Sequence, residues 1–212
     1  MFRDRIDAGR QLAHALLAKA LPDPVVLALP RGGVPVAAEV ARALKAPLDL
    51  LLVRKIGAPH QPELALAAVA EGGALAINED VLEAVGASPA YVEQQARAQA
   101  QEIARRRSLY VGGRAPVPVA GRSAIVVDDG IATGATMRAA LRLLRERAPA
   151  RIVLAVPVAP PDTIDSMRPL VDDLVCLDTP AYFHAVGAHY VDFDQVDDAT
   201  VTRLLGATSG GA

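Results

Sequence analysis

Two adjacent acids, Asp128 and Asp129, follow the apolar run Ala124–Val127, and a loop of small residues leads from them to Thr136. Small residues allow several backbone N–H groups to point into one concavity, where the N-terminus of a following helix adds positive potential. Such a loop predicts a phosphate site, to which the hydroxyl groups of Thr133 and Thr136 add donors. Carboxylates aimed at a phosphate would repel it, so we expect the two acids to accept hydrogen bonds from hydroxyl groups nearby. A phosphorylated sugar presents that pattern, although the same residues also suit an ordinary acidic strand-to-helix turn.

The segment Leu29–Gly33 combines one cation with two glycines at the end of an apolar run. Gly32 and Gly33 permit a close approach of the backbone to a ligand, and Arg31 adds a fixed positive charge. The pattern indicates an anion site, and it suits equally a tight strand-to-helix turn with an arginine on the surface.

Two cations, Arg54 and Lys55, directly follow the apolar run Leu48–Val53, which we expect to be a strand of the same sheet. At the carboxyl end of that strand they could bind a diphosphate and stabilise the charge of a leaving group. The polar stretch after them indicates a loop that closes over the site, in which His60 or Glu63 could exchange a proton with a substrate. Solvated strand-end charges and an inert surface loop are the alternatives.

The segment Ala124–Thr136 resembles the thirteen-residue motif by which type I phosphoribosyltransferases bind phosphoribosyl diphosphate (PRPP). The likeness consists of the apolar run, the two acids and a short loop that ends in Thr-Gly-x-Thr. The loop has neither the Gly-Lys-Ser/Thr of a Walker loop nor the glycine spacing of a dinucleotide fingerprint. The resemblance implies that Asp128 and Asp129 bind the ribose hydroxyls of PRPP. It also implies that the 5-phosphate is held by Ala132, Thr133, Gly134, Ala135 and Thr136.

The loop departs from the family's pattern at two positions. Gly130 stands where a branched apolar residue is more usual, and Ala132 stands where enzymes for 6-oxopurines commonly have an Asp that acts on the base. The second departure argues against hypoxanthine or guanine as the acceptor. Elsewhere, Leu29–Gly33 resembles the family's pyrophosphate loop, which often contains a non-proline cis peptide, and Lys55 lies near the position where the family has a lysine.

Short apolar runs alternate with helical patterns along the chain. Unbroken apolar runs are typical of strands covered on both faces, which indicates a parallel sheet between helix layers. We therefore predict a doubly wound α/β fold with a mostly parallel sheet, flanking helices and a small hood and hairpin subregion. The strands are expected at Val25–Leu29, Leu48–Val53, Ala124–Val127, Ile152–Val156 and Leu174–Leu177. The helices are expected at Arg3–Ala20, Val34–Leu44, Pro89–Arg107, Thr136–Arg147, Pro161–Arg168 and Gln195–Leu205, with Ser88, Asp194 and Gly206 as end signals.

An insert interrupts this alternation over residues 56–78. It is expected to hold a mobile loop over residues 57–62, followed by a hairpin of Leu66–Ala70 and Ala74–Asn78 around Gly72-Gly73. The sequence of this region, with its Arg-Lys-Ile-Gly-Ala-Pro and Pro-Glu-Leu-Ala stretches, resembles a bacterial branch of the phosphoribosyltransferase family.

The tail, residues 179–212, holds four of the seven Phe and Tyr residues within Tyr182–Phe193. We expect it to form a hood over one edge of the sheet, within a single domain that spans residues 1–212. The pair His184 and His189 could bind a metal, but aromatic packing in the hood is the favoured interpretation. The tail also resembles the same bacterial branch.

The composition excludes several classes of protein. Of the 212 residues 52% are hydrophobic and 22% are charged, which allows a buried core and excludes a largely disordered chain. A formal net charge of −2 disfavours nucleic-acid binding, and the single cysteine, Cys176, excludes an intrachain disulfide and is expected in the core. No leader or membrane span is visible, so a cytoplasmic protein with no membrane partner is expected. The run Arg105–Arg107 is interpreted as a solvated helix end.

Together these observations predict a phosphoribosyltransferase that passes the phosphoribosyl group of PRPP to a nitrogen acceptor, such as a nucleobase, and releases diphosphate. Mg²⁺ is the expected cofactor, held mainly by PRPP, with Asp128 or Asp129 as a candidate further contact. The expected catalytic residues are Lys55, Arg31, Asp129 and Glu63. A PRPP-sensing regulatory protein on the same fold is the leading alternative, and a phosphosugar isomerase or hydrolase is a third. An apolar first helix would suit a homodimer.

Overall fold

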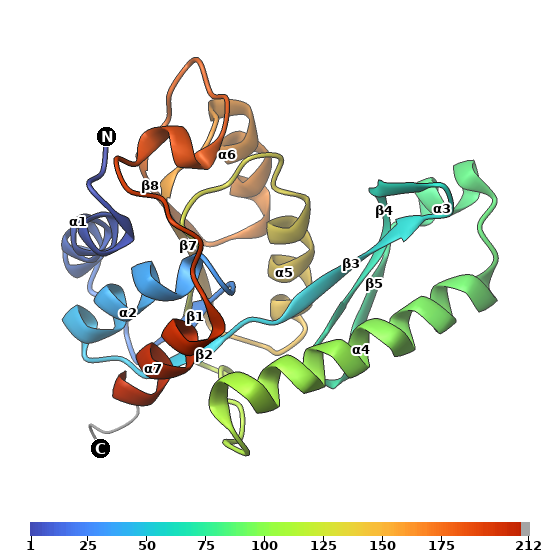
Figure 1. Ribbon diagram of the computed structural model, residues 1–212, viewed down its shortest axis with the longest axis horizontal. Coiled ribbons are helices and arrows are strands. Elements are labelled where there is room, and N and C mark those ends of the chain that lie inside the picture. Colours follow the sequence, from blue (N-terminus) through green and yellow to red (C-terminus); the bar gives the residue numbers. More distant parts are fainter. Residues whose placement is uncertain (209–212) are drawn as a thin grey trace.

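The computed structural model describes residues 1–208, apart from the side chains of Glu63 and Thr208, and divides them into a core and an antiparallel extension (Figure 1). The strands of the core are β1 (Pro24–Ala28), β2 (Leu48–Leu50), β6 (Ser123–Val127), β7 (Arg151–Val158) and β8 (Asp173–Asp178). Its helices are α1 (Arg5–Leu17), α2 (Gly33–Leu44), α5 (Ala135–Arg145), α6 (Pro161–Met167) and α7 (Asp198–Thr208). The extension consists of β3 (Val53–Ala58), β4 (Gln61–Ala70), β5 (Leu75–Ile77), α3 (Glu79–Val85) and α4 (Pro89–Val111).

The five strands of the core sheet are all parallel and lie in the order β2-β1-β6-β7-β8. The predicted doubly wound α/β fold is thereby confirmed. The chain winds from β1 to β2 in one direction and from β6 to β8 in the other, so the winding reverses between β1 and β6. Ligands of such sheets bind beyond the carboxyl ends of the strands at this reversal. The loops after β1 and β6 therefore occupy the expected position for a site.

Different helices cover the two faces of the core sheet. Alternate residues of a strand point to opposite faces. In β1, Val26 and Ala28 pack with α1, α2 and α7, whereas Val25 and Leu27 pack with α5 and α6. Figure 1 shows these two helix layers on either side of the sheet. Because all four side chains are fully buried, the strand appears in the sequence as an unbroken apolar run.

The predicted strand Leu48–Val53 is wrong in its extent. β2 is only three residues long because β1 beside it ends at Ala28, whose carbonyl accepts a last hydrogen bond from the N–H of Leu51 at 2.9 Å. The chain then leaves the core sheet and enters β3 of a separate antiparallel sheet with the order β3-β4-β5. Arg54 and Lys55 therefore lie at the start of the extension and not at the carboxyl end of a core strand.

The insert over residues 56–78 contains more strand than expected. The predicted loop over residues 57–62 is a turn of two residues, since Ala58 pairs directly with Gln61. The register of β3 against β4 shifts on both sides of Gly57, so the glycine that suggested a loop marks a bulge instead. The expected hairpin around Gly72-Gly73 is present and joins β4 to β5.

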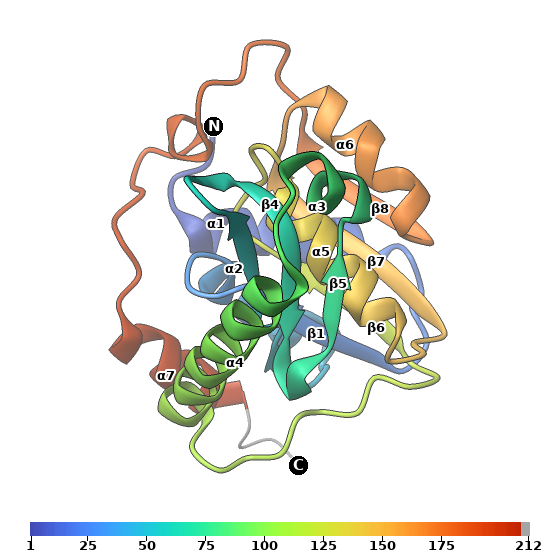
Figure 2. The ribbon, with the colours of Figure 1, turned by 90° about the vertical axis from the view of Figure 1, so that its right-hand side faces the viewer.

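Helices α3 and α4 follow the hairpin. The prediction does not include α3, although Gly86 directly after it adopts the left-handed conformation that commonly ends a helix. Ser88 caps α4 as predicted, because its hydroxyl oxygen accepts a hydrogen bond from the N–H of Tyr91 at 3.2 Å. Figure 2 shows α4 beside the antiparallel sheet. Among the helices of residues 1–208, none combines the length and the apolar character that crossing a bilayer would require.

The last helix begins later than the predicted Gln195–Leu205. Asp197, and not Asp194, caps it, since the carboxylate of Asp197 accepts a hydrogen bond from the N–H of Thr200 at 2.7 Å. Gly206, the predicted end, lies inside α7. Of the predicted tail, residues 209–212 lie outside the described part of the chain.

Candidate functional site

Two loops meet at the carboxyl ends of β1 and β6. The first, residues 29–33, leads into α2, and the second, residues 128–134, leads into α5. A Cβ atom added to Gly32 would lie 2.1 Å from Oδ2 of Asp129, so a larger residue at this position would collide with the carboxylate. The two segments that the sequence assigns to one ligand are thus in direct contact.

The acid pair after β6 is largely buried. Oδ1 of Asp128 accepts a hydrogen bond from the N–H of Asp129 at 2.9 Å. Burial raises the pKa of Asp128 well above its usual range, and the negative charge of Asp129 adds to the rise. Burial also raises the pKa of Asp129, against the opposing effect of Arg5. A ligand that supplies hydroxyl donors or a cation would therefore stabilise the charged form of both carboxylates.

Asp129 is held by residues that are distant in the sequence. Nε of Arg5, in α1, donates to Oδ2 of Asp129 at 2.8 Å, and the hydroxyl group of Tyr190 donates to the backbone carbonyl of Asp129 at 2.6 Å. Arg5 lies over the ring of Phe193, with 3.8 Å from its guanidinium carbon to the ring centre. Arg5 is not among the site residues predicted from the sequence, because no local pattern distinguishes it. Tyr190 and Phe193 belong to the predicted aromatic tail.

The carbonyl groups of the loop after the acids have partners of their own. Gly134 precedes α5 with a φ of +73° and has no side chain that could cap the helix. The first N–H groups of a helix have no partner within it. The carbonyls of Ala132 and Thr133 accept hydrogen bonds from Thr163 and Arg138 at 2.8 and 2.9 Å. The predicted phosphate loop therefore offers donors, while these two carbonyl oxygens are already engaged.

Arg31 in the first loop lies close to α7, the last helix. The peptide bond between Pro30 and Arg31 is cis. Nη1 of Arg31 lies 3.6 Å from Oδ1 of Asp198 in α7, and the hydroxyl group of Tyr110 in α4 donates to the same oxygen at 2.7 Å. Gly33 is buried at the start of α2. The last helix thus contacts the predicted pyrophosphate loop through Arg31, and α4 contacts the same carboxylate.

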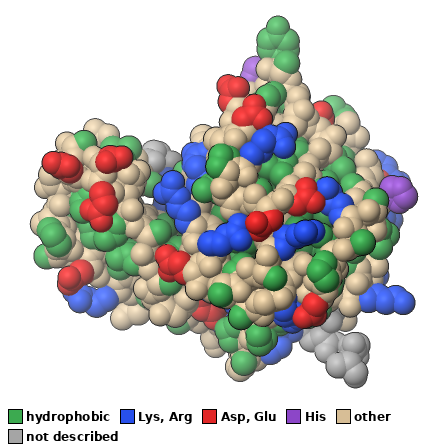
Figure 3. Space-filling model, turned by 180° about the vertical axis from the view of Figure 1, so that it is seen from behind, with side chains coloured by type: hydrophobic (Ala, Val, Ile, Leu, Met, Phe, Trp, Pro, Cys, Tyr) green, Lys and Arg blue, Asp and Glu red, His purple; other side chains and the backbone are tan. Residues whose placement is uncertain are grey.

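Arg54 and Lys55 line different cavities on either side of β3, as neighbouring strand residues commonly do. Arg54 borders a cavity of about 100 Å³ together with Pro30 of the first loop and Thr136 in the first turn of α5. Lys55 borders a cavity of about 260 Å³ between the extension and α5, which begins at Ala135. Figure 3 shows Lys and Arg side chains gathered where the extension meets the core. Arg54 therefore lies beside the Pro30 loop, whereas Lys55, which the family resemblance indicated, lies on the other side of β3.

The other residues considered for chemistry lie in the β3–β4 hairpin and in the tail. His60 is exposed in the turn between β3 and β4. Glu63 lies in β4, and its side chain lies outside the described part of the structure. In the tail His184 is exposed, whereas the ring of His189 stacks on Phe183 with 5.4 Å between the ring centres. His189 thus takes part in aromatic packing.

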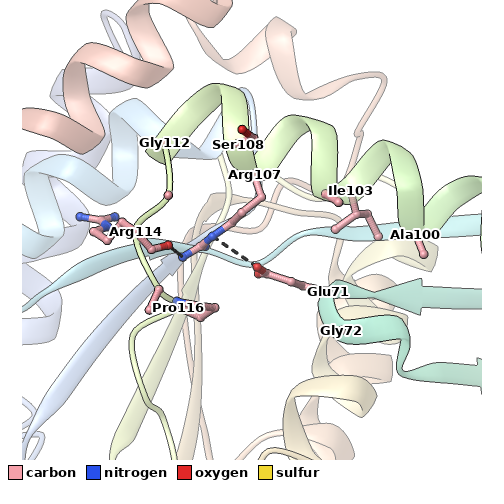
Figure 4. Close-up of a pocket in the computed structure, with 12 residues that line it drawn as sticks. Glu71, Gly72, Ala100, Ile103, Arg107, Ser108, Gly112, Arg114 and Pro116 are labelled. Carbon is pink, nitrogen blue, oxygen red and sulfur yellow. Dashed lines mark hydrogen bonds and ion pairs between the residues drawn. The ribbon is translucent and has the colours of Figure 1, made fainter.

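A cavity of about 360 Å³ lies beside the last turns of α4 (Figure 4). Arg107 extends along it, with Nη1 and Nη2 at 2.6 and 3.1 Å from the carboxylate of Asp49 and Nε at 3.3 Å from Glu71. Burial raises the pKa of Glu71. The interpretation of Arg105–Arg107 as solvated is therefore wrong for Arg107, because α4 packs against the core. This ion-pair network joins α4 and the β4–β5 turn to β2, which indicates a structural role.

The chain is similar to known proteins over almost its whole length. Residues 3–191 match the family model described as phosphoribosyl transferase domain. Two proteins of Mycobacterium tuberculosis, from strains CDC 1551 / Oshkosh and H37Rv, are each named "Putative phosphoribosyl transferase" and are 47% identical over 205 residues. The match covers 97% of this chain and 46% of each relative, so the chain spans about half the length of these relatives. A crystal structure of TT1426 from Thermus thermophilus is 46% identical with a TM-score of 0.88, over 96% of this chain and 97% of that one.

Proposed function

This chain belongs to the phosphoribosyl transferase domain family, and from that premise we propose that it transfers the phosphoribosyl group of PRPP to a nitrogen nucleophile with release of diphosphate. The observation that carries the proposal is the direct contact between Gly32 and the acid pair, directly before a helix N-terminus. It brings an anion loop, two carboxylates and uncapped N–H groups to one point of the sheet edge. PRPP carries a diphosphate, two ribose hydroxyls and a 5-phosphate, which match these three groups.

Each part of the site has a separate task in this reaction. Asp128 and Asp129 accept hydrogen bonds from the ribose hydroxyls and fix the sugar. The N–H groups and hydroxyls of residues 132–136 hold the 5-phosphate. As the bond from ribose to diphosphate breaks, negative charge grows on the leaving group, and Arg31 and Arg54 stabilise it. Positive charge grows on the sugar, close to the ionised acid pair.

Lys55 and Glu63 retain proposed roles of a different kind. Lys55 borders the cavity at the start of α5, so its charge would support the phosphate bound there and not the diphosphate. Glu63 lies in β4, one residue after Pro62, on the strand that follows the β3–β4 turn. We retain it as the group that exchanges a proton with the acceptor.

Mg²⁺ suits the donor set at the acid pair. The carboxylate oxygens of Asp128 and Asp129 are the hard ligands that this ion prefers, and burial raises the pKa of both acids, so a bound cation would favour their charged forms. Among the described residues no group of three or more His, Cys, Asp or Glu side chains could hold a metal ion. Most of the ligands would therefore come from PRPP and water. When bound, the ion would neutralise charge on the diphosphate.

We propose a nucleobase as the acceptor, bound beneath the tail. The tail contacts the acid pair, since a Cβ atom on Gly130 would lie 2.5 Å from Val186 and Tyr190 donates to the carbonyl of Asp129. Phe183 is occupied by its stacking on His189, and Tyr182 is 89% exposed.

The test begins with calorimetric titration of the protein with PRPP and Mg²⁺, and with ribose 5-phosphate. We expect PRPP to bind, and we expect the variant Asp128→Asn/Asp129→Asn to lose binding while it keeps its fold. Release of diphosphate that depends on an added nucleobase would then identify a transferase and its acceptor. Binding without release for any base would indicate a PRPP-sensing protein. Equal affinity for ribose 5-phosphate would indicate a phosphosugar enzyme instead.

A further inference from the structure

Three consecutive arginines of α4 have three different environments. The side chain of Arg105 is 62% exposed and pairs with Glu102, whereas that of Arg107 is 9% exposed and pairs with Asp49. Arg106 is 30% exposed and borders the 100 Å³ cavity beside Pro30. Successive residues of a helix point about 100° apart, so the three neighbouring arginines extend in three different directions. Of the three arginines, Arg106 is the one that lines this cavity together with Pro30.

Arg106 is anchored through one side of its guanidinium group. Its Nε donates to Oε1 of Glu102, one turn earlier in α4, at 2.7 Å. Hydrogen bonds from Arg105 and Arg106 lower the pKa of Glu102 to about 2, so this carboxylate is ionised at neutral pH. Within residues 1–208, neither Nη atom of Arg106 makes a hydrogen bond. The side chain is therefore oriented while its terminal nitrogens still have donors to offer.

Arg54 has the same kind of anchor on the same helix. Its Nε donates to Oε1 of Gln99 at 2.9 Å. Gln99, Ile103 and Arg106 follow one another at intervals of four and three residues, so they lie along one face of α4. Ile103 and Arg106 border the cavity directly, and Gln99 acts on it by holding Arg54. One helix face thus places two guanidinium groups beside the same cavity.

We propose that Arg106 binds the diphosphate of PRPP together with Arg54, so that α4 is part of the substrate site. The inference rests on the proposed function. None of the residues that line the cavity is acidic. Hydrogen bonds from a guanidinium group to a phosphate are charge-assisted and strong, and side chains anchored in advance lose little freedom when the ligand binds. The two cations also lie where negative charge grows on the leaving group.

The test compares Arg106→Gln with Arg105→Gln, a neighbour that shares the partner Glu102 but is exposed. Calorimetric titrations use PRPP with Mg²⁺, and ribose 5-phosphate, which has the pentose and the 5-phosphate but no diphosphate. Arg106→Gln should weaken PRPP binding by about 10- to 100-fold and leave ribose 5-phosphate binding unchanged. Arg105→Gln should change neither affinity by more than about twofold. Arg106→Lys should recover part of the loss, because it restores the charge without the planar fork.

The outcomes separate this inference from the proposed function. If Arg106→Gln binds PRPP as well as the unchanged protein, the inference is overturned and the proposed function stands. Equal losses for PRPP and ribose 5-phosphate would also overturn it, because they would indicate a general disturbance of the site. If the unchanged protein fails to bind PRPP, the proposed function itself is refuted. Thermal melting of each variant measures folding independently of binding.

Discussion

Nε of Arg5 lies 2.8 Å from Oδ2 of Asp129, although the two residues are 124 positions apart in the sequence. Arg5 opposes the effect of burial, which raises the pKa of Asp129. A ribose hydroxyl that binds this acid must use its other oxygen or displace Arg5, and in both cases the ionised carboxylate is the stronger acceptor. Helix α1 therefore bears on ligand binding through the charge state of one acid.

Replacement of Arg5 should shift the pH dependence of PRPP binding. In Arg5→Gln the pKa of Asp129 loses the influence that lowers it, so the acid is protonated at higher pH. The acidic limb of the binding curve should move to higher pH. Calorimetric titration across the acidic limb measures the shift. Arg3→Gln is the control, because Arg3 is 76% exposed and pairs with Asp7; a limb that moves equally in both variants would contradict the role of Arg5.

Asp128→Asn should stabilise the fold and abolish PRPP binding. The pKa of Asp128 is raised in the folded protein, chiefly by burial, so the folded state takes up a proton at higher pH than the unfolded state does. The ionised acid consequently reduces stability at neutral pH. Asn keeps an oxygen that can accept from the N–H of Asp129 but carries no charge. We expect Tm to rise by about 2–4 °C at neutral pH, which corresponds to about 1 kcal/mol for a chain of this length.

The same linkage fixes how this difference changes with pH. As the pH falls below the raised pKa of folded Asp128, the penalty shrinks, and it is gone once the acid of the unfolded chain is protonated as well. The gap in Tm between Asp128→Asn and the unchanged protein should therefore narrow in acid. Differential scanning calorimetry over a pH series checks this, and a gap that widens in acid would show that the acid is stabilising when charged.

Gly32→Ala should impair binding far more than stability. The added Cβ would lie 2.1 Å from Oδ2 of Asp129, so the carboxylate must move away from its present position. We expect PRPP affinity to fall by about 10- to 100-fold, since small displacements of a binding group have effects of that order. Gly113→Ala is the matched control because nothing lies within 4 Å of the added atom. Titration and thermal melting of both variants separate the two effects.

Arg107→Met should destabilise the protein strongly. Its guanidinium group pairs with Asp49, whose side chain is only 2% exposed, and its removal leaves that buried charge with the more distant Arg114, at 3.7 Å, as its cation. Urea unfolding should register a loss of about 3–5 kcal/mol. The exposed pair of Arg105 with Glu102 predicts a change below about 1 kcal/mol for Arg105→Met. Losses of similar size in the two variants would mean that burial of the Asp49 pair is unimportant.

Much of the core could be predicted from the sequence because its signals are local. Fully buried parallel strands appear as apolar runs, and β1, β6, β7 and β8 lie within two residues of the predicted bounds. The predicted strand Leu48–Val53 extends too far, since its end depends on where the neighbouring β1 stops, which no local pattern contains. Similarly, Gly57 and the prolines near it indicate a loop, whereas Gly57 and Pro62 lie in the paired strands β3 and β4 and only Pro59 lies in the turn.

Of the candidate site, too, one part could be predicted from the sequence and another part could not. The types of residue needed to bind a sugar phosphate are visible in Asp128–Thr136 and Leu29–Gly33, because each loop carries its own chemistry in consecutive positions. The partners of those residues, Arg5 on Asp129, Asp198 on Arg31 and Gln99 on Arg54, become visible only in the folded chain. The pattern of apolar and polar residues reflects the geometry of a single helix or strand, whereas these pairs depend on how separate elements pack.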